Sequence, residues 1–426
     1  MPRLTLALGA TLLACVPWLG HAAPLALNEV IKPPAVDAQY KPRAFGYRAD
    51  ADDRYIALSD VERGGSTVFI YSTKDFSLVR TIEVGDLFRG PRSAQTFDLE
   101  IRGNRLAIAG INSTFDGDDR SAVGVFNLRN GRLVKRIAPP RPGEVVRSVS
   151  FADGGLILGS SSEDGRGETL FHVFDRRLRL QSSFGGPAVS NFLTEVEHED
   201  GRLFVSDYGA SAPGIEFSGG SGKVFVLDVA SGQVEREIAS PFAGLGYFGW
   251  DIAAEGGRLA VGSMLGAGVY DAATGDLIST LLPTETASPR TGSFFGSSID
   301  LRGDTVAVGA MYGSLASPNM GGAYLFDAVS GEVLQTFGNP TPDVRYPRSN
   351  PDLFGENVEL IRSGLLVTAS LDDTPFAKDV GTAYFYGRGP AIEAAEPGLA
   401  PVPLPASAWL LLGGALGLLL LRRQRA

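Results

Sequence analysis

The sequence predicts an all-β fold, a seven-bladed β-propeller of four-stranded blades that is closed by an N-terminal strand completing the last blade. Three observations predict it: a long-period repeat, four short apolar runs in copies one to six, and a last copy that lacks its fourth run. The copies align on the residue that follows the third apolar run, namely Ser72, Asn127, Asp175, Asp228, Asp271, Asp327 and Gly387. The mean interval is about 52 residues, which is close to the period of a propeller blade.

The sixth copy shows its four predicted strands most clearly. Residues 298–301, 305–310, 322–326 and 332–337 are short runs rich in β-branched and aromatic residues, separated by Gly, Asp and Ser. Such runs favour strands. The connection between the last two runs ends at Gly331, and glycine accepts the positive φ of a hairpin turn. The second run of each copy carries small residues, as in 260–263, which predicts that this strand lies near the crowded axis.

Ring closure accounts for the missing fourth run of the seventh copy. That copy extends from Phe354 to Tyr386 and contains three runs. Residues 25–34 near the start of the chain resemble residues 332–340, the fourth run of the preceding copy. We therefore expect residues 27–31 to pair with residues 383–386. Pairing of this kind covers a sheet edge that otherwise invites aggregation.

The repeat itself resembles a known family. A Phe-Gly start, a Val-Gly-Ala second run and a Gly-Ala-Tyr-Leu-Phe third run are similar to the FG-GAP class of β-propeller repeat, most closely in copies five, six and seven. Copies two, three and four have Thr96-Phe97, Arg147-Ser148 and Phe192-Leu193 where Phe-Gly is expected. FG-GAP repeats often contain an Asp-rich calcium loop, but residues 301–305 form a short hairpin here. The resemblance therefore implies the fold and not calcium binding.

Both ends of the chain differ in composition from the repeats. Residues 1–23 combine a basic start, an apolar stretch and small residues at Ala22 and Ala23, which predicts a secretory signal peptide. Its removal takes away Cys15, the chain's only cysteine. The propeller is expected over residues 24–388, followed by a Pro- and Ala-rich linker over 389–405 and a hydrophobic segment with a basic end over 406–426.

The end of the chain contains a short motif, an uncharged stretch and a basic end. The motif is Val402, Pro403, Leu404, Pro405 and Ala406, and the stretch that follows reaches Leu421, before Arg422 and Arg423. This layout resembles a PEP-CTERM sorting signal in its Val-Pro-Leu-Pro-Ala variant. The resemblance implies recognition by an exosortase-type enzyme of a Gram-negative bacterium. It also implies transient insertion in the inner membrane, then delivery to the cell surface or extracellular matrix. A plain tail anchor with its basic end in the cytoplasm is the alternative.

Charge excludes one class of partner. The terminal segments contain four arginines and no acidic residue, so the remainder has 34 basic and 48 acidic residues and a net charge of −14. A domain with this balance is not expected to bind nucleic acid.

Residues for catalysis are few. His172 and His198 lie in predicted strands without a second histidine at metal-binding spacing, so we interpret both as packed or surface residues. Residues 219–223 lack the earlier glycine and the final Ser or Thr of a phosphate-binding loop. The sequence thus predicts no catalytic residue and no organic cofactor.

Two groups of carboxylates are candidate metal ligands. Asp116, Asp118 and Asp119 share one loop with Asn112, and oxygen ligands in a loop suit calcium. Asp60 and Asp207 end the second runs of copies one and four, where they are expected near one mouth of the channel. Solvation of the loop and capping of backbone amides are the alternatives for these groups.

The sequence therefore leaves two function classes. We predict a surface-displayed, non-catalytic binding or structural module for a protein or polysaccharide partner. The alternative is a propeller enzyme, a metal-dependent hydrolase or lyase with its site at the channel mouth. Convergence of carboxylates or histidines on the axis distinguishes the two classes, because propellers host both.

Overall fold

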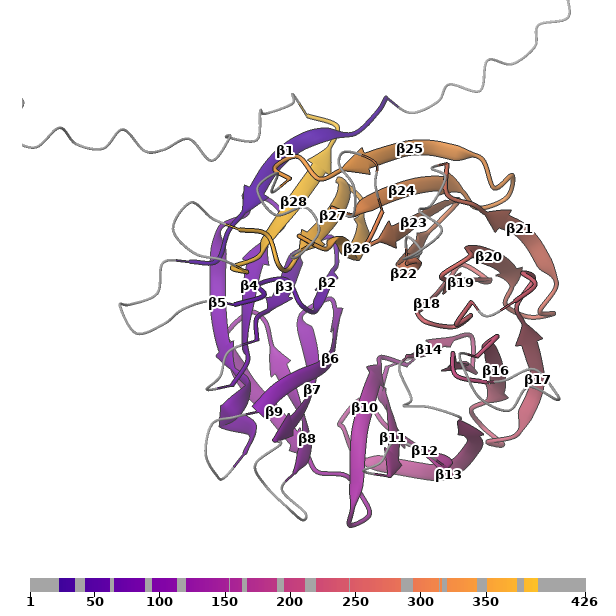
Figure 1. Cartoon of the computed structure of the whole chain (residues 1–426). Coiled ribbons are helices and arrows are strands. Elements are labelled where there is room, and N and C mark those ends of the chain that lie inside the picture. Colours follow the sequence, from indigo (N-terminus) through magenta and orange to yellow (C-terminus); the bar gives the residue numbers. More distant parts are fainter. Residues whose placement is uncertain are drawn as a thin grey trace, which may run out of the picture.

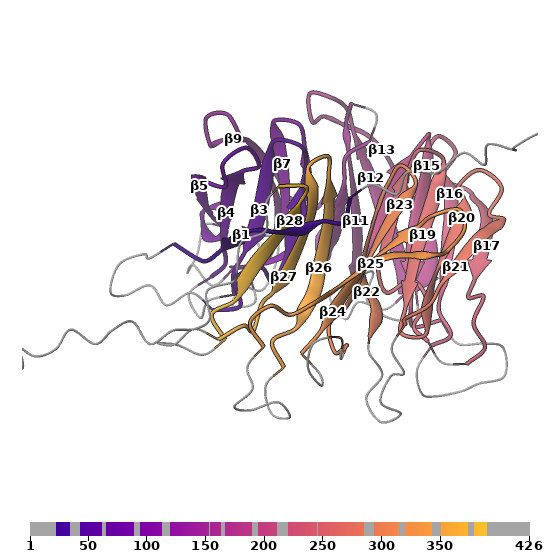
Figure 2. The same ribbon diagram turned by 90° about the horizontal axis from the view of Figure 1, so that it is seen from above.

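The fold is the predicted seven-bladed β-propeller. The computed structural model describes residues 23–389 except residues 35–42, 62–64, 89–93, 113–119, 153, 163–166, 190–194, 211–219, 245, 285–293, 314, 316–319, 343–350 and 374–378. Seven four-stranded antiparallel sheets stand around one axis (Figure 1 and Figure 2). Blades 1 to 6 each use four consecutive strands, starting with β2, and blade 7 has the order β26-β27-β28-β1 from inside to outside.

The first strand of each blade is innermost (Figure 1). These strands are β2 (Ala49–Ala51), β6 (Ala94–Arg102), β10 (Glu144–Ser150), β14 (Val196–Glu199), β18 (Ile252–Glu255), β22 (Phe295–Arg302) and β26 (Phe354–Ile361). The second strands are β3 (Tyr55–Ser59), β7 (Arg105–Asn112), β11 (Leu156–Ser162), β15 (Arg202–Asp207), β19 (Arg258–Ser263), β23 (Thr305–Ala310) and β27 (Gly364–Ala369).

The third strands end at the residues used to align the repeat, or one residue before. They are β4 (Thr67–Ser72), β8 (Ser121–Asn127), β12 (Gly167–Phe174), β16 (Lys223–Asp228), β20 (Gly266–Asp271), β24 (Gly322–Asp327) and β28 (Thr382–Gly387). The outer strands are β5 (Leu78–Glu83), β9 (Arg132–Ile137), β13 (Leu180–Val189), β17 (Val234–Ala239), β21 (Leu277–Leu281), β25 (Val333–Gly338) and β1 (Ala26–Ile31). A short 3-10 helix, Val84–Leu87, follows β5.

The predicted ring closure is confirmed. Strand β1 pairs antiparallel with β28, and Leu27 lies opposite Tyr386 while Ile31 lies opposite Ala383. The side-chain amide of Gln335 in β25 also exchanges two hydrogen bonds with the backbone of Leu25. The N-terminal strand thus joins blade 7 to blade 6 as well as completing its own sheet.

The apolar core lies between the blades. Each of seven clusters of buried residues combines faces of two neighbouring blades, and one of them joins blade 7 to blade 1 through Phe45, Phe69 and Phe385. A blade therefore buries its apolar faces only when both neighbours are present, as expected for a repeat architecture.

The prediction that the second strand lies near the axis is wrong, because the first strand does. The small residues of the second strand have another role. A Cβ at Gly262 would lie 2.3 Å from the carbonyl oxygen of Gly296, and one at Gly309 would lie 2.1 Å from that of Gly355. The second strands of blades 5 and 6 carry small residues because the Phe-Gly turn of the next blade packs against them. Gly296 and Gly355 themselves have φ values of 78° and 89°.

Candidate functional site

The innermost strands surround an axial cavity of about 550 Å³ that all seven blades line. Nine of its lining residues are acidic, and two, Arg48 and Arg147, are basic. The acidic residues are Asp50, Asp98, Glu100, Glu195, Glu197, Asp251, Asp300, Glu356 and Glu359. Acidic residues therefore outnumber basic residues by nine to two around the axis.

Five of these carboxylates join neighbouring blades. An innermost strand has a neighbour in its sheet on one side only, so its other edge carries unpaired N–H groups. Each of the five accepts a hydrogen bond from such an N–H in the next blade. The pairs are Asp50 with Ile101, Asp98 with Val149 (2.8 Å), Glu100 with Phe151 (2.6 Å), Asp251 with Ile299 (2.7 Å) and Asp300 with Leu360 (2.5 Å). These five carboxylates therefore have a structural role, because each one links its blade to the next.

The other four carboxylates are available to a ligand. Within the described residues, the carboxylates of Glu195, Glu197 and Glu359 accept no hydrogen bond. Glu356 accepts a hydrogen bond from Ser370, but its Oε2 atom is buried and has no partner among the described residues. Buried polar atoms without partners are rare in native proteins, so the cavity suits a ligand that donates hydrogen bonds or carries positive charge.

Burial and mutual repulsion raise the pKa values of the axial carboxyls. Burial is the main cause throughout, and neighbouring carboxylates add to it for most of them. The pKa is raised to about 7 for Asp50, Asp251 and Glu356, to about 8 for Glu100 and to about 6 for Asp300. The pKa values of Glu195, Glu197 and Glu359 are raised well above the ordinary value. Positive charge in the cavity would oppose these shifts.

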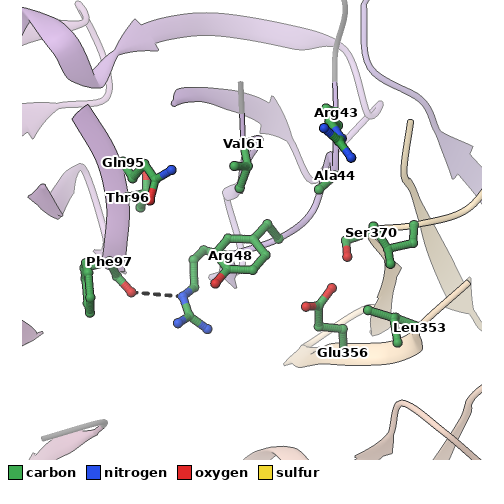
Figure 3. Close-up of a pocket in the computed structure, with 12 residues that line it drawn as sticks. Arg43, Ala44, Arg48, Val61, Gln95, Thr96, Phe97, Leu353, Glu356 and Ser370 are labelled. Atoms are coloured by element: carbon green, nitrogen blue, oxygen red, sulfur yellow. Dashed lines mark hydrogen bonds between the residues drawn. The ribbon is translucent and has the colours of Figure 1, made fainter. Parts of the chain in front are cut away.

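Arg48 supplies positive charge between the axial cavity and a side cavity of similar volume (Figure 3). Its Nε donates a hydrogen bond to the carbonyl oxygen of Phe97 (2.9 Å). In Figure 3 its guanidinium and the carboxylate of Glu356 point into the same open space. Its charge offsets part of the rise that burial causes in the pKa values of Asp98 and Asp251.

Aromatic rings form a wall on another side of the axial cavity. The ring centroids of Tyr208, Tyr247 and Trp250 lie 5.0 to 6.1 Å from one another. Trp250 also contacts Phe294 at 5.9 Å, and Phe294 contacts Tyr312 at 5.1 Å. All five side chains are half-buried. We call Tyr208, Tyr247 and Trp250 the aromatic wall, and Tyr208 and Trp250 line the cavity directly.

The backbone turn before each Phe-Gly pair places part of this wall. Tyr247 and Phe294 precede Phe-Gly pairs and have φ values of 50° and 48°. Ala44 and Leu353, which precede the Phe-Gly pairs of blades 1 and 7, have the same left-handed conformation. This conformation is uncommon for residues other than glycine. The turn is therefore a repeated feature, and blades 5 and 6 carry aromatic residues at it.

Asp60 and Asp207 are both buried at or next to the ends of their second strands. Asp60 Oδ1 accepts a hydrogen bond from the backbone N–H of Thr67 (2.7 Å), which is the capping alternative. Asp207 lies opposite Lys223 in the strand register. The two residues belong to blades 1 and 4, and neither lines the axial cavity. Cation binding by them stays a prediction.

Other predicted sites lie outside the described residues. These are Asp116, Asp118 and Asp119, the sorting motif, and all of the signal peptide except its last residue. Asn112, which precedes that loop, is buried at the end of β7. In the described ranges there is no group of three or more His, Cys, Asp or Glu residues arranged to hold a metal ion. No helix there is long and apolar enough to cross a bilayer.

His172 belongs to a line of polar side chains across blade 3. Its Nε2 lies 2.9 Å from Glu144 Oε2 and its Nδ1 lies 2.8 Å from Ser183 Oγ. Ser160 Oγ lies 3.3 Å from His172 Nε2 and 3.4 Å from Glu144 Oε2. Each of the four residues comes from a different strand of the blade. The imidazole is fully buried and burial lowers its pKa, in agreement with the prediction of a packed strand residue.

The sequence interpretation missed the axial carboxylates and the aromatic wall. A signal for the carboxylates exists: five of the aligned copies have an acidic residue two positions before the first hairpin corner. These residues are Asp50, Glu100, Glu197, Asp300 and Glu359. No comparable signal exists for the wall, because Tyr208 and Trp250 come from different blades.

Comparison with known proteins agrees with this architecture. Residues 286–326 match the FG-GAP repeat family. That segment includes the first three strands of blade 6 and supports the resemblance of the sixth copy. No curated protein matches the chain.

Two solved WD40 domains have a similar fold. The Pan2 WD40 domain of Neurospora crassa has a TM-score of 0.55 and 9% identity, over 87% of this chain and 97% of that domain. The WD40 β-propeller domain of Doa1 has a TM-score of 0.53 and 13% identity, over 86% of this chain and 98% of that domain. At these identities the likeness concerns the fold alone.

Proposed function

We propose that this chain is an exported β-propeller, displayed at the cell surface or in the extracellular matrix, that binds a protein or glycan partner without transforming it. The observation that carries the proposal is the axial cavity, which combines free carboxylates, Arg48 and an aromatic wall. A concave site with aromatic surface and a few polar groups is the usual form of a ligand site.

Export and display rest on the ends of the sequence. The N-terminal segment fits a signal peptide, and residues 402–406 with Arg422 and Arg423 fit the sorting signal. Fractionation of cells that produce the full chain tests this part. We expect the protein in the surface or matrix fraction, and we expect Pro403→Ala with Pro405→Ala to leave it in the inner membrane. Equal distribution of both proteins would contradict the sorting proposal.

Binding is tested by probing arrays of extracellular glycans and matrix proteins with the purified full chain. We expect capture of at least one ligand that Glu356→Gln or Tyr208→Leu weakens, because both residues line the cavity. The matched control is Glu332→Gln, which makes the same chemical change on an exposed hairpin. Capture that is equal in all variants would place the binding surface elsewhere.

The alternative is an enzyme, and one observation favours it. Glu356 has a pKa of about 7, and raised pKa values in a cavity are typical of catalytic acids. Burial alone accounts for the raised pKa of Glu356, so this value does not require a catalytic role. Incubating each captured ligand with the full chain separates the two cases. We expect the ligand to be recovered unchanged, whereas a product that Glu356→Gln abolishes would establish the enzyme.

A further inference from the structure

The aromatic wall offers π faces to the same cavity that Glu195 and Glu197 line. Tyr208 follows β15. In that strand the Ser206 N–H donates a hydrogen bond to the carbonyl oxygen of Glu195, just before β14, and the Glu195 N–H donates one to Ser206 Oγ. Glu195, Glu197, Tyr208 and Trp250 all line the axial cavity. The wall and the two glutamates therefore belong to the same sector of the cavity, formed by blades 4 and 5.

The charges around Glu195 and Glu197 are mostly negative. Glu195 is repelled by Asp98, Asp251 and Glu197, and Arg48 is the one cation that acts on it appreciably. The charged groups with the largest effect on Glu197 are Glu100, Asp98, Asp251 and Asp50, all of them acidic. These acidic groups therefore repel one another when they ionise, and a cation in this sector would stabilise their charged forms.

We propose that the aromatic wall, together with Glu195 and Glu197, binds an alkylammonium group, such as the quaternary ammonium of choline or the side chain of lysine. Aromatic faces attract cations through the ring quadrupole, and the attraction grows as the site loses water. The carboxylates supply the counter-charge. This inference rests on the proposed function, since it names the chemical class that the binding cavity accepts.

An organic cation fits this sector better than a metal ion. Calcium and magnesium need several oxygen ligands at short distances, and the described residues contain no such group. Three aromatic rings in mutual contact provide apolar surface for methyl or methylene groups around a positive charge. Choline and butylammonium are therefore suitable probes, and 3,3-dimethyl-1-butanol is the neutral counterpart of choline with the same shape.

Isothermal titration calorimetry on the full chain tests the inference. We expect choline and butylammonium to bind at one site, and the neutral alcohol to bind at least about tenfold more weakly, as loss of about 1.4 kcal/mol implies. Trp250→Leu and the double variant Glu195→Gln with Glu197→Gln should each weaken choline binding about tenfold. Trp250→Phe keeps a π face and should weaken it less, and Glu332→Gln should leave it unchanged.

Three results would overturn the inference: no choline binding, equal binding of choline and the neutral alcohol, or calcium binding that depends on Glu195 and Glu197 in place of choline binding. Choline should also compete with whatever ligand the arrays reveal. If the arrays give a ligand that choline does not displace, the inference fails while the proposed binding function stands. If the arrays give no ligand, the binding function fails, and the choline titration still decides whether the ammonium site exists.

Discussion

Gly262 of blade 5 lies so close to Gly296 of blade 6 that a Cβ at Gly262 would be 2.3 Å from the carbonyl oxygen of Gly296. The atom that would be displaced is backbone, so the contact cannot relax by a change of rotamer. Gly262→Ala should therefore destabilise the propeller by about 2–3 kcal/mol. Gly185→Ala is the matched control, because a Cβ there meets nothing within 4 Å. Thermal unfolding of both variants measures the difference, and equal midpoints would refute the packing role of the Phe-Gly turn.

The axial carboxylates that join blades should contribute to stability. Asp251→Ala removes the acceptor of the Ile299 N–H, and leaving a buried donor unpaired costs about 1–3 kcal/mol. The control is Asp276→Ala, at an exposed turn of the same blade. Urea unfolding at pH 5 suits this comparison. Burial raises the pKa of Asp251 to about 7, so its carboxyl is mostly neutral at pH 5 and the substitution removes little negative charge. A loss no greater than that of the control would mean that the bond is dispensable.

Stability should fall as the pH rises from about 4 to about 8. Folding raises the pKa values of the axial carboxyls from ordinary values of 3.8 and 4.5 to about 6 to 8. The folded chain therefore keeps protons that the unfolded chain releases over this range, and the free energy of unfolding decreases with pH. Below this range the trend reverses, because exposed residues such as Asp271 and Asp327 have lowered pKa values. Melting temperatures across the pH range test the expected maximum near pH 4 to 5.

A single substitution isolates the contribution of axial repulsion. Glu359 accepts no hydrogen bond among the described residues, and carboxylates of Asp50, Asp300 and Asp251 act on it. Glu359→Gln should raise the melting temperature by about 2–4 °C at pH 8 and leave it unchanged at pH 4.5. Glu332→Gln, on an exposed hairpin, should change neither value. A Glu359→Gln effect of equal size at both pH values would argue for altered packing instead of charge.

The two hydrogen bonds between the Gln335 side chain and the Leu25 backbone should hold the N-terminal strand in place. Gln335→Ala removes two hydrogen bonds of 2.8 and 2.7 Å to the Leu25 backbone, each worth about 1 kcal/mol. We expect thermolysin to cut within residues 25–31 about tenfold faster in this variant. Gln181→Ala is the control, because the Gln181 side chain bonds only to its own strand segment, at Arg179. Unchanged cleavage in Gln335→Ala would show that β1 is held by its sheet alone.

Local patterns explain why the fold was predictable. Strand and hairpin signals such as Asp327 to Gly331 act within a few residues, so each blade could be recognised separately. The pairing of β1 with β28 followed from one missing strand and one surplus strand. The order of strands from the axis outward could not be read in the same way, because a four-stranded meander has the same sequence pattern in either orientation.

The candidate site was less accessible to sequence reasoning. Asp98, Asp251 and Asp300 each alternate with apolar neighbours, as surface residues of any strand do. Their position on the axis depends on which strand is innermost, and that depends on packing between blades. In the aromatic wall the ring centroids of Tyr208 and Trp250 lie 5.0 Å apart, although the two residues belong to different blades. No local sequence pattern encodes this contact.

The central claim is that the partner binds in the axial cavity between the aromatic wall and the free glutamates. Amide hydrogen exchange of the full chain, with and without a ligand captured from the arrays, tests this claim most directly. We predict that binding slows exchange in segments 206–210, 247–252 and 294–298, around the wall, and leaves the hairpins at 256–258 and 303–305 unchanged. Slower exchange confined to those hairpins or to the outer strands would contradict the account.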